Sequence, residues 1–219
     1  KDAFEFLSLL LDRVEETIKA TSEQKNFIKD LFGGSFANKI VSKDCPHSYS
    51  GEEAFIGVNL VVKDTSNIQQ SLAHFIQEQT LAGDDAYFCE KCNKKVRATK
   101  HVSFKNLPQY VIFDLNRFQY DIYRNLRIKI NDYYEFSQEL DLAPYTQEYH
   151  SENNHDPEEY LYQLKGVVVH AGGAESGHYF SIIKDPVADQ PRWLEFNDTH
   201  VSEFDIENLP KAAFGDIMR

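Results

Sequence analysis

The spacing of apolar residues divides this chain into two parts, and this division most limits the folds available to it. Near the start, apolar side chains recur at helical spacing, at Ala3, Leu7, Leu10, Val14 and Ile18. This spacing predicts an amphipathic helix over roughly the first twenty residues. Asp2, followed by Glu5 three positions later, predicts a capping box at the start of that helix.

A second helix is predicted in the first half of the chain from apolar residues at the same spacing, at Ile68, Leu72, Phe75 and Ile76. Either Ser66 or Asn67 would cap it. Strands are predicted from alternating or β-branched runs between turns, at residues 55–62, 97–104, 110–115, 160–170, 178–184 and 192–196. Helices confined to the first half and long strands in the second predict an α+β fold with an antiparallel sheet. The polar, acidic stretch 146–159 is predicted to be a surface insertion or a disordered loop.

The chain carries a formal net charge of -12 over 219 residues. We therefore expect no nucleic acid and no membrane among its partners, because both attract basic surfaces. A basic partner would be favoured electrostatically. Three cysteines, two of them in one C-x-x-C, do not make a disulfide framework in a chain of this length. The composition predicts a globular protein of the cytoplasm, or of the nucleus as well.

Cys89 and Cys92 enclose a polar turn after a predicted strand, as in a zinc knuckle, where two thiolates converge on one metal. A tetrahedral site needs two more ligands, and Cys45 and His47 are the nearby upstream pair of suitable donors. The competing interpretation is packed thiols and a surface histidine. A thioredoxin-like redox role is less favoured, because no βαβ unit surrounds the motif. We predict a structural zinc ion held by Cys45, His47, Cys89 and Cys92.

His178 opens a predicted strand directly after the glycine-rich stretch 172–177, where glycines permit close approach of a substrate. Nineteen positions later, Asn197 and Asp198 end another strand. Either could accept a hydrogen bond from Nδ1–H of His178, as the third member of a Cys-His-Asn or Cys-His-Asp triad does. Taken alone, these residues are more simply explained as a loop histidine and an Asx turn.

Several motifs in a fixed order change that interpretation. They are Asp2-x-x-Glu5-Phe6, Cys89-x-x-Cys92, Leu115-Asn116-Arg117-Phe118, Gly177-His178-Tyr179 and Trp193-x-x-Phe196-Asn197-Asp198. Their order and spacing resemble the ubiquitin-specific protease family over almost the whole chain. Gly33-Gly34-Ser35-Phe36 and Asn131-Asp132-Tyr133-Tyr134-Glu135-Phe136 resemble its fat-facets branch.

The resemblance implies a papain-like palm and thumb, with an antiparallel β fingers subdomain that carries a zinc ribbon and grips ubiquitin. Residues 1–32 would form the thumb helix region, 33–110 the fingers with the zinc site, and 111–219 the palm with the catalytic histidine.

The same resemblance implies roles for individual residues. His178 would be the general base, Asn197 would hold it, and Asp198 would support the pair. Asp2 and Glu5 would meet the basic tail of ubiquitin, and helix capping is a competing or additional role for them. Phe118 and Tyr179 would line the channel for that tail, and core packing is the competing explanation. For Phe118 the two explanations are equally favoured.

The family's cysteine box and closing strand are expected outside this chain, before its first helix and after Gly215. The leading hypothesis is a deubiquitinase, a thiol hydrolase that cuts the isopeptide or peptide bond after the ubiquitin C-terminus of ubiquitinated proteins. Its nucleophilic cysteine would lie on the missing N-terminal segment of the same domain, so this fragment alone would be inactive. The alternative is a ubiquitin-binding pseudoenzyme without hydrolase activity. Cys45, which precedes a proline that could begin a helix, is a less favoured nucleophile.

Overall fold

The computed structural model describes residues 2–21, 26–149, 158–187 and 192–216. Most of the predicted insertion at 146–159 lies outside these ranges. The chain forms two compact units. Unit 1 comprises Lys1–Asn59, Leu72–Asp114 and Leu142–Tyr160, and unit 2 comprises Leu60–Ser71, Leu115–Asp141 and Leu161–Arg219. Within the described ranges, no helix combines the length and apolar character needed to cross a membrane.

Both helices predicted from apolar spacing are present. The first is α1 (Ala3–Thr21), and Asp2 caps it, because Asp2 Oδ1 accepts hydrogen bonds from the N–H of Phe4 at 2.8 Å and of Glu5 at 3.1 Å. A short helix, α2 (Phe27–Phe32), follows. The second predicted helix is α3 (Ile68–Ile76), where Asn67 Oδ1 accepts from the N–H of Gln70 at 2.9 Å. Asn67 is therefore the side-chain cap.

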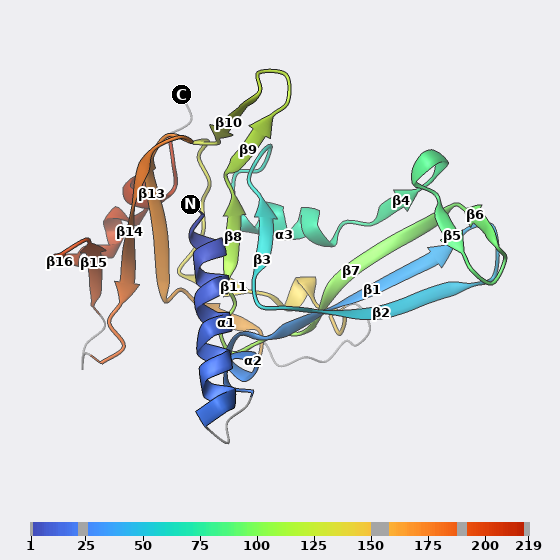
Figure 1. Ribbon diagram of the computed structural model, residues 1–219, viewed down its shortest axis with the longest axis horizontal. Helices are drawn as coiled ribbons and strands as arrows, with labels where there is room; N and C mark the ends of the chain where they lie inside the picture. The colour runs from blue at the N-terminus through green and yellow to red at the C-terminus, as the bar shows by residue number, and fades with distance from the viewer. Residues whose placement is uncertain (1, 22–25, 150–157, 188–191, 217–219) are drawn as a thin grey trace. The chain divides into compact units, whose positions relative to one another are not determined.

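Unit 1 is built on an antiparallel sheet with the strand order β2-β1-β7-β4 (Figure 1). Its strands are β1 (Gly34–Ser42), β2 (Ser48–Phe55), β4 (Gln79–Leu81) and β7 (Ala98–Asn106). A separate hairpin of β5 (Tyr87–Cys89) and β6 (Lys94–Val96) carries the predicted knuckle, and η1 (Gly83–Asp85) and η2 (Ala143–Tyr145) are 3-10 turns. The core at one end of the sheet is aromatic: the rings of Phe36, Phe55, Phe75 and Phe104 pack at centroid separations of 4.3–6.1 Å.

The strand predicted at 55–62 is interrupted. β2 ends at Phe55, and β3 (Val58–Val61) pairs with a different strand, β8 (Phe113–Asn116). Gly57 lies between them, and a Cβ there would come within 2.4 Å of the Phe4 ring. A side chain at this position would clash with that ring, so the chain changes partner at a glycine.

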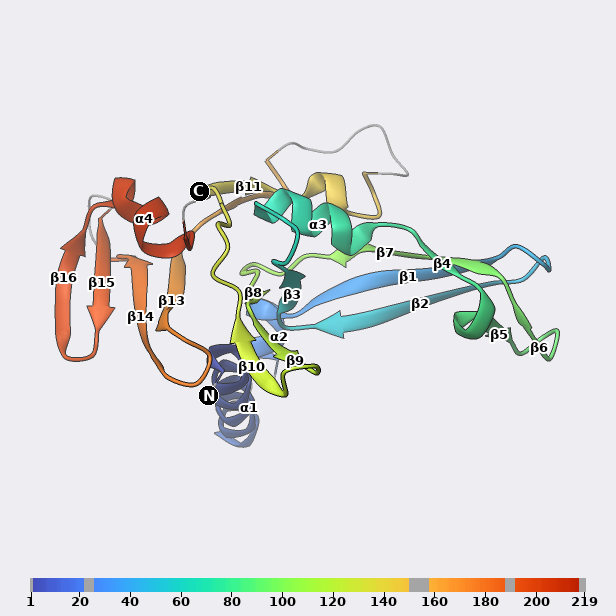
Figure 2. The same ribbon diagram turned by 90° about the horizontal axis from the view of Figure 1, so that it is seen from above.

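Unit 2 contains a second antiparallel sheet, with the order β13-β14-β15-β16 (Figure 2). Its strands are β13 (Gly166–Gly172), β14 (Gly177–Lys184), β15 (Trp193–Asn197) and β16 (His200–Phe204). Beside it lie η3 (Ile206–Asn208) and α4 (Leu209–Ala213), and the core they form is lined by Ile182, Trp193, Leu209 and Phe214. Unit 2 also contains the hairpin of β9 (Phe118–Asp121) with β10 (Leu126–Lys129), and the antiparallel pair of β11 (Glu139–Asp141) with β12 (Leu161–Gln163).

Two sequence predictions for this unit are wrong in detail. The strand predicted at 160–170 is two strands, because β12 pairs with β11 whereas β13 pairs with β14. Helices are not confined to the first half of the chain, since α4 lies near its end. A helix of five residues is too short to show a 3.6-residue period. The predicted class, α+β with antiparallel sheets, is confirmed.

Candidate active site and metal centre

His178 is the second residue of β14, at the end of a tight glycine turn. Gly172 and Gly177 are register partners at the end of the β13–β14 pair where the turn joins the two strands. Gly172 has φ +111, and a Cβ there would lie 2.8 Å from Gly177 Cα. The turn therefore requires glycine, and it leaves the His178 side chain 46% exposed. The imidazole is ordered by the sheet and open to a substrate.

Asn197 and Asp198 both reach the His178 ring. Asn197 is the last residue of β15, and its Oδ1 lies 2.6 Å from His178 Nε2. Asp198 begins the turn into β16 with φ 53, and its Oδ2 lies 3.9 Å from the same nitrogen. A strand would direct neighbouring side chains to opposite faces, but the turn at Asp198 removes that restriction.

The structure corrects one atom of the prediction, which placed Nδ1 of His178 toward the third residue. The nitrogen that faces Asn197 is Nε2. An amide oxygen only accepts hydrogen bonds, so Nε2 carries the proton in the neutral ring. Nδ1 then holds the lone pair.

Phe118 and Tyr179 both pack against a third ring, that of His170. The Phe118 ring meets the His170 ring edge to face at 5.1 Å, and the Tyr179 ring lies 4.7 Å from it. Both aromatic side chains are half-buried. Contact with His170 therefore explains part of the burial of both rings. That Phe118 and Tyr179 also line a channel for the ubiquitin tail stays a prediction.

Asp2 and Glu5 are exposed at the start of α1. The capping role of Asp2 uses one carboxylate oxygen, Oδ1, on two backbone N–H groups. A carboxylate can accept further hydrogen bonds at its other oxygen, so capping leaves capacity for a cationic partner.

Cys45, His47, Cys89 and Cys92 converge in unit 1, and their ligand atoms all lie within 4.8 Å of one another. Cys45 Sγ lies 3.8 Å from Cys89 Sγ, and His47 Nδ1 lies 3.5 Å from Cys89 Sγ and 3.3 Å from Cys92 Sγ. A tetrahedral zinc with bonds of about 2.3 Å to sulfur and about 2.0 Å to nitrogen would place its ligands about 3.8 Å (S–S) and about 3.5 Å (S–N) apart. The donor set fits zinc.

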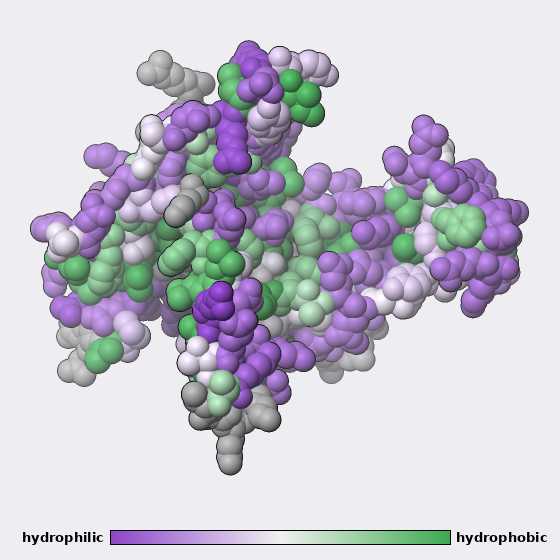
Figure 3. All heavy atoms as spheres, in the orientation of Figure 1, coloured by the Kyte–Doolittle hydropathy of each residue, from purple (hydrophilic) through white to green (hydrophobic). Residues whose placement is uncertain are grey.

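The surroundings of the cluster fit a structural metal as well. Apart from a small apolar area, the surface over the β5–β6 end of unit 1 is hydrophilic (Figure 3), and Phe88 there is 51% exposed. The buried apolar side chains that follow Cys92 in the chain, Val96 and Ala98, are small. So small a core stabilises a hairpin weakly, which is the setting in which bound metal contributes folding free energy.

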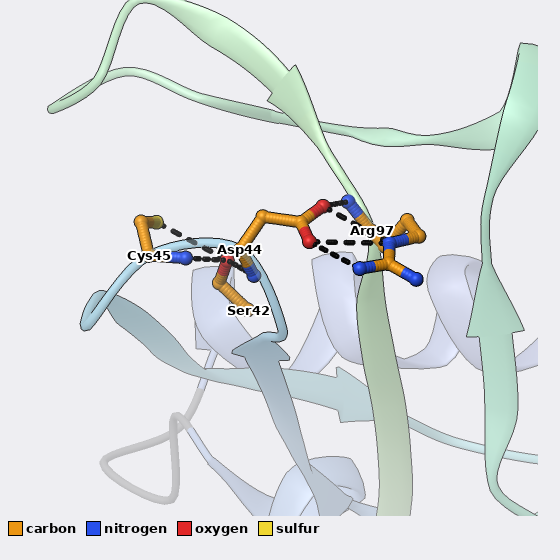
Figure 4. A network of polar contacts seen from close by, with 4 residues as sticks. All are labelled: Ser42, Asp44, Cys45 and Arg97. Atoms are coloured by element: carbon orange, nitrogen blue, oxygen red, sulfur yellow. Dashed lines mark hydrogen bonds and ion pairs between the residues drawn. The ribbon is translucent and has the colours of Figure 1, made fainter.

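The loop that carries Cys45 and His47 is held by a polar network that the sequence analysis missed (Figure 4). Arg97 Nη2 lies 2.7 Å from Asp44 Oδ1, and the backbone N–H of Arg97 donates to Asp44 Oδ2 at 2.8 Å. The Ser42 hydroxyl oxygen lies 3.1 Å from both N and Sγ of Cys45. In the sequence, this network could have been noticed only from Asp44, directly before Cys45, and Arg97, five positions after Cys92. A long-range ion pair of this kind leaves no periodic pattern.

Cys45 lies in a bend between β1 and β2, not at the start of a helix, so the basis for treating it as a nucleophile is removed. The adjacent Ser42 hydroxyl lowers the pKa of the Cys45 thiol to about 6, whereas burial, followed by contact with Cys45 and Cys89, raises the pKa of Cys92 to about 11. Thiolates this close repel one another, and a central cation would remove that repulsion.

The histidine–amide pair thus lies in unit 2, and the Cys/His cluster lies in unit 1. Residues 1–214 match the sequence model of the family described as ubiquitin carboxyl-terminal hydrolase. The chain is 37% identical over 232 residues to human ubiquitin carboxyl-terminal hydrolase 34, covering 98% of this chain and 6% of that protein. It is 38% identical over 231 residues to the probable ubiquitin carboxyl-terminal hydrolase FAF of Drosophila melanogaster, covering 98% and 8%.

A solved structure is also similar. With a TM-score of 0.81 and 25% identity, the chain matches a chain of the SAGA Ubp8/Sgf11/Sus1/Sgf73 DUB module bound to ubiquitin aldehyde, covering 98% of this chain and 48% of that one. The fold is thus shared with that chain of the DUB module. The chain belongs to the ubiquitin carboxyl-terminal hydrolase family, as its motifs predict, and it spans under a tenth of the curated relatives named above.

Proposed function

We propose that this chain forms the ubiquitin-binding and general-base part of a deubiquitinase, a thiol-dependent hydrolase whose nucleophilic cysteine lies outside it. The observation that carries the proposal is the 2.6 Å contact between His178 Nε2 and Asn197 Oδ1, at the glycine turn of a chain in this family. A histidine whose far nitrogen is held by an amide is oriented to accept a proton at Nδ1.

The proposed reaction runs in two steps. His178 Nδ1 takes the proton of the thiol, the sulfur attacks the carbonyl carbon of the last ubiquitin residue, and the lysine amine leaves with the proton from His178. A water molecule then gives a proton to His178 and cleaves the thioester, which releases the ubiquitin carboxylate and restores the thiol. Asn197 keeps the ring in the required tautomer throughout, and Asp198 at 3.9 Å supports the imidazolium electrostatically.

We also propose that Cys45, His47, Cys89 and Cys92 hold a structural zinc ion in a fingers region spanning residues 33–110. The convergence of four donor atoms within 4.8 Å supports this assignment. Zinc there would stabilise the β5–β6 hairpin and would take no part in the proton transfers.

The test uses a ubiquitin–fluorophore conjugate with two proteins: the 219-residue chain, and the same chain supplied with an upstream segment that contains a cysteine box. We expect turnover from the second protein only, and we expect His178→Ala to abolish it. His74→Ala, at an exposed histidine of α3, is the control and should leave turnover unchanged.

Two results would contradict the proposal. Turnover by the 219-residue chain that Cys45→Ala abolishes would make Cys45 the nucleophile. Tight ubiquitin binding without turnover in the supplemented protein would favour the pseudoenzyme, which holds ubiquitin and does not cut it.

A further inference from the structure

We propose that Lys129 is a positioning residue that fixes the strand segment opposite His178 and so keeps the general base in place. This inference rests on the proposed function for its consequence in catalysis. It rests on unit 2 alone for its geometry.

The side chain of Lys129, the last residue of β10, reaches β13. Its Nζ donates to the carbonyl oxygen of His170 at 2.7 Å and to that of Gly172 at 3.1 Å. These two carbonyls flank Ala171, which is the register partner of His178 in the β13–β14 pair. One ammonium group thus binds the backbone on both sides of the residue that lies opposite the proposed base.

The segment held in this way needs external support. Gly172 has φ +111, and the turn that follows it is closed by a hydrogen bond from the N–H of Gly173 to the carbonyl of Ser176 at 2.9 Å. Glycine backbones lose more conformational entropy on ordering than other residues do. Charge-assisted hydrogen bonds from Lys129 offset part of that loss, because they are stronger than bonds between neutral groups.

Side-chain packing joins the same two hairpins. Phe118 is the register partner of Lys129 on β9, and its ring packs on the ring of His170. A Cβ at Gly177 would lie 2.2 Å from His170 Nε2, so the ring of His170 presses on the backbone directly before His178. The β9–β10 hairpin therefore holds residue 170 twice, by its carbonyl through Lys129 and by its ring through Phe118.

Burial and neighbouring charges act on both Lys129 and His170 at this contact. Burial lowers the pKa of Lys129, and the nearby Arg117 lowers it further. Burial, followed by the charge of Lys129, lowers the pKa of His170 too, which favours a neutral ring beside the ammonium. His170 Nδ1 is buried and has no hydrogen-bond partner among the described residues, so this ring acts as packing.

The test reads the His178 ring directly, by 15N NMR of the 219-residue chain labelled in histidine and glycine. In the wild-type chain we expect the Nε2–H tautomer at His178, held by Asn197. In Lys129→Met, which keeps the length of the stem and removes the charge, we expect that preference to be lost to tautomer averaging. We also expect the amide of Gly173 to exchange at least about tenfold faster, because the turn opens more often.

Two further variants separate positioning from a general loss of stability. Lys63→Met removes an exposed lysine of the same unit and should match the wild type in both signals. Lys129→Arg keeps a charged donor and should restore most of the Nε2–H preference. If Lys129→Met does not fold, Lys129→Gln is measured instead and judged by the same signals. Identical His178 and Gly173 signals in Lys63→Met and the neutral Lys129 variant would overturn the proposal.

Kinetics on the chain supplied with the cysteine-containing segment give the second measurement. A misplaced base lowers kcat, by about 10- to 100-fold for Lys129→Met, with KM changed far less. An inactive wild type with the expected NMR differences would contradict the proposed function and leave the positioning role supported. An active enzyme whose kcat is the same in Lys129→Met and Lys63→Met would contradict the positioning role.

Discussion

His178 Nε2 and Asn197 Oδ1 lie 2.6 Å apart on the neighbouring strands β14 and β15. The strands are paired in the sheet from Ser181 with Phe196 to Lys184 with Trp193, so the contact continues a hydrogen-bonded ladder toward its open end. A side-chain bond placed in this way inherits its geometry from the backbone. The imidazole orientation is therefore set before any substrate binds, which is the condition for an efficient proton acceptor.

Asn197→Ala should lower kcat more than Asp198→Ala does. The amide is in hydrogen-bond contact, whereas Asp198 Oδ2 lies 3.9 Å away on a side chain that is 78% exposed. We expect a loss of about 10- to 100-fold for Asn197→Ala and less than about threefold for Asp198→Ala, with KM changed little in both. Asn197→Asp keeps an acceptor and should recover most of the loss. The reverse ranking in steady-state kinetics would assign the third position to Asp198.

Helices could be predicted from this sequence more accurately than strands, for a physical reason. Ile68 and Leu72 of α3 are buried, and Leu7, Val14 and Ile18 of α1 are half-buried, so the apolar residues of both helices follow a helical period. Their caps, Asp2 and Asn67, are visible in the sequence. β1 and β2 were not predicted as strands. β2 reads Ser-Tyr-Ser-Gly-Glu-Glu-Ala-Phe, and only its last residue is buried. A strand that is exposed over most of its length shows no alternation of apolar and polar residues, so only its pairing with β1 identifies it as a strand.

The candidate metal ligands could be predicted because their chemistry restricts residue type and spacing: Cys89 and Cys92 were visible as a turn motif, and Cys45 and His47 followed as partners of suitable chemistry. The pair of His178 and Asn197 could be predicted only from the order of motifs along the whole chain, because a histidine after a glycine turn is by itself a weak signal. The identity of the facing nitrogen could not be predicted, since it depends on the χ angles of His178. Lys129 was also missed, because its partners are backbone carbonyls, which any residue type supplies.

Asp2 and Glu5 should contribute to ubiquitin binding through charge, and the two roles of Asp2 can be separated. Asn is as good an N-cap as Asp, so Asp2→Asn should not lower the thermal stability of the chain and should weaken ubiquitin binding. Asp2→Ala should in addition cost about 1 kcal/mol of stability. Glu5→Gln should weaken binding without a change in stability. Binding isotherms at low and high salt measure the effect, which added salt should reduce.

The control for these variants is Glu16→Gln, in the exposed Arg13–Glu16 pair of the same helix. It removes an equal charge away from the capped end and should leave affinity unchanged. Equal losses at Glu16 and Glu5 would mean that net charge, and not a specific contact, attracts ubiquitin. Unchanged affinity in Asp2→Asn and Glu5→Gln would leave helix capping as a sufficient account of Asp2.

The purified chain should contain about one zinc ion per molecule, measured by elemental analysis without prior chelation. Cys92→Ser should lower the zinc content and the thermal stability together, because structural zinc contributes folding free energy. A strong chelator should destabilise the wild type and have little further effect on Cys92→Ser. His47→Ala should behave like Cys92→Ser, whereas His101→Ala, on β7 of the same unit, should keep the metal. Zinc-free protein with wild-type stability would refute the assignment.

Asp114 should make the chain less stable as the pH rises through the acidic range. Burial, followed by the negative charge of Asp2, raises the pKa of this carboxyl in the folded chain. Between the unfolded pKa of about 3.9 and the raised folded pKa, the folded state binds more protons than the unfolded state does, so stability falls as pH increases. Above the folded pKa the full cost of ionising Asp114 is present, and below about pH 4 it is absent.

Asp114→Asn should therefore raise the Tm at pH 7, and the gain should disappear as the pH falls below about 4. Asp30→Asn, at an exposed position of the same unit, is the matched control and should show no such pH-dependent gain. Part of the cost comes from Asp2, so the gain from Asp114→Asn should be smaller in an Asp2→Asn background, and the difference measures the coupling. The measurement is thermal unfolding at pH 3.5 and pH 7 of the wild type, Asp114→Asn, Asp2→Asn and the double variant. A gain present only in acid would reverse the sign and contradict the assigned cause.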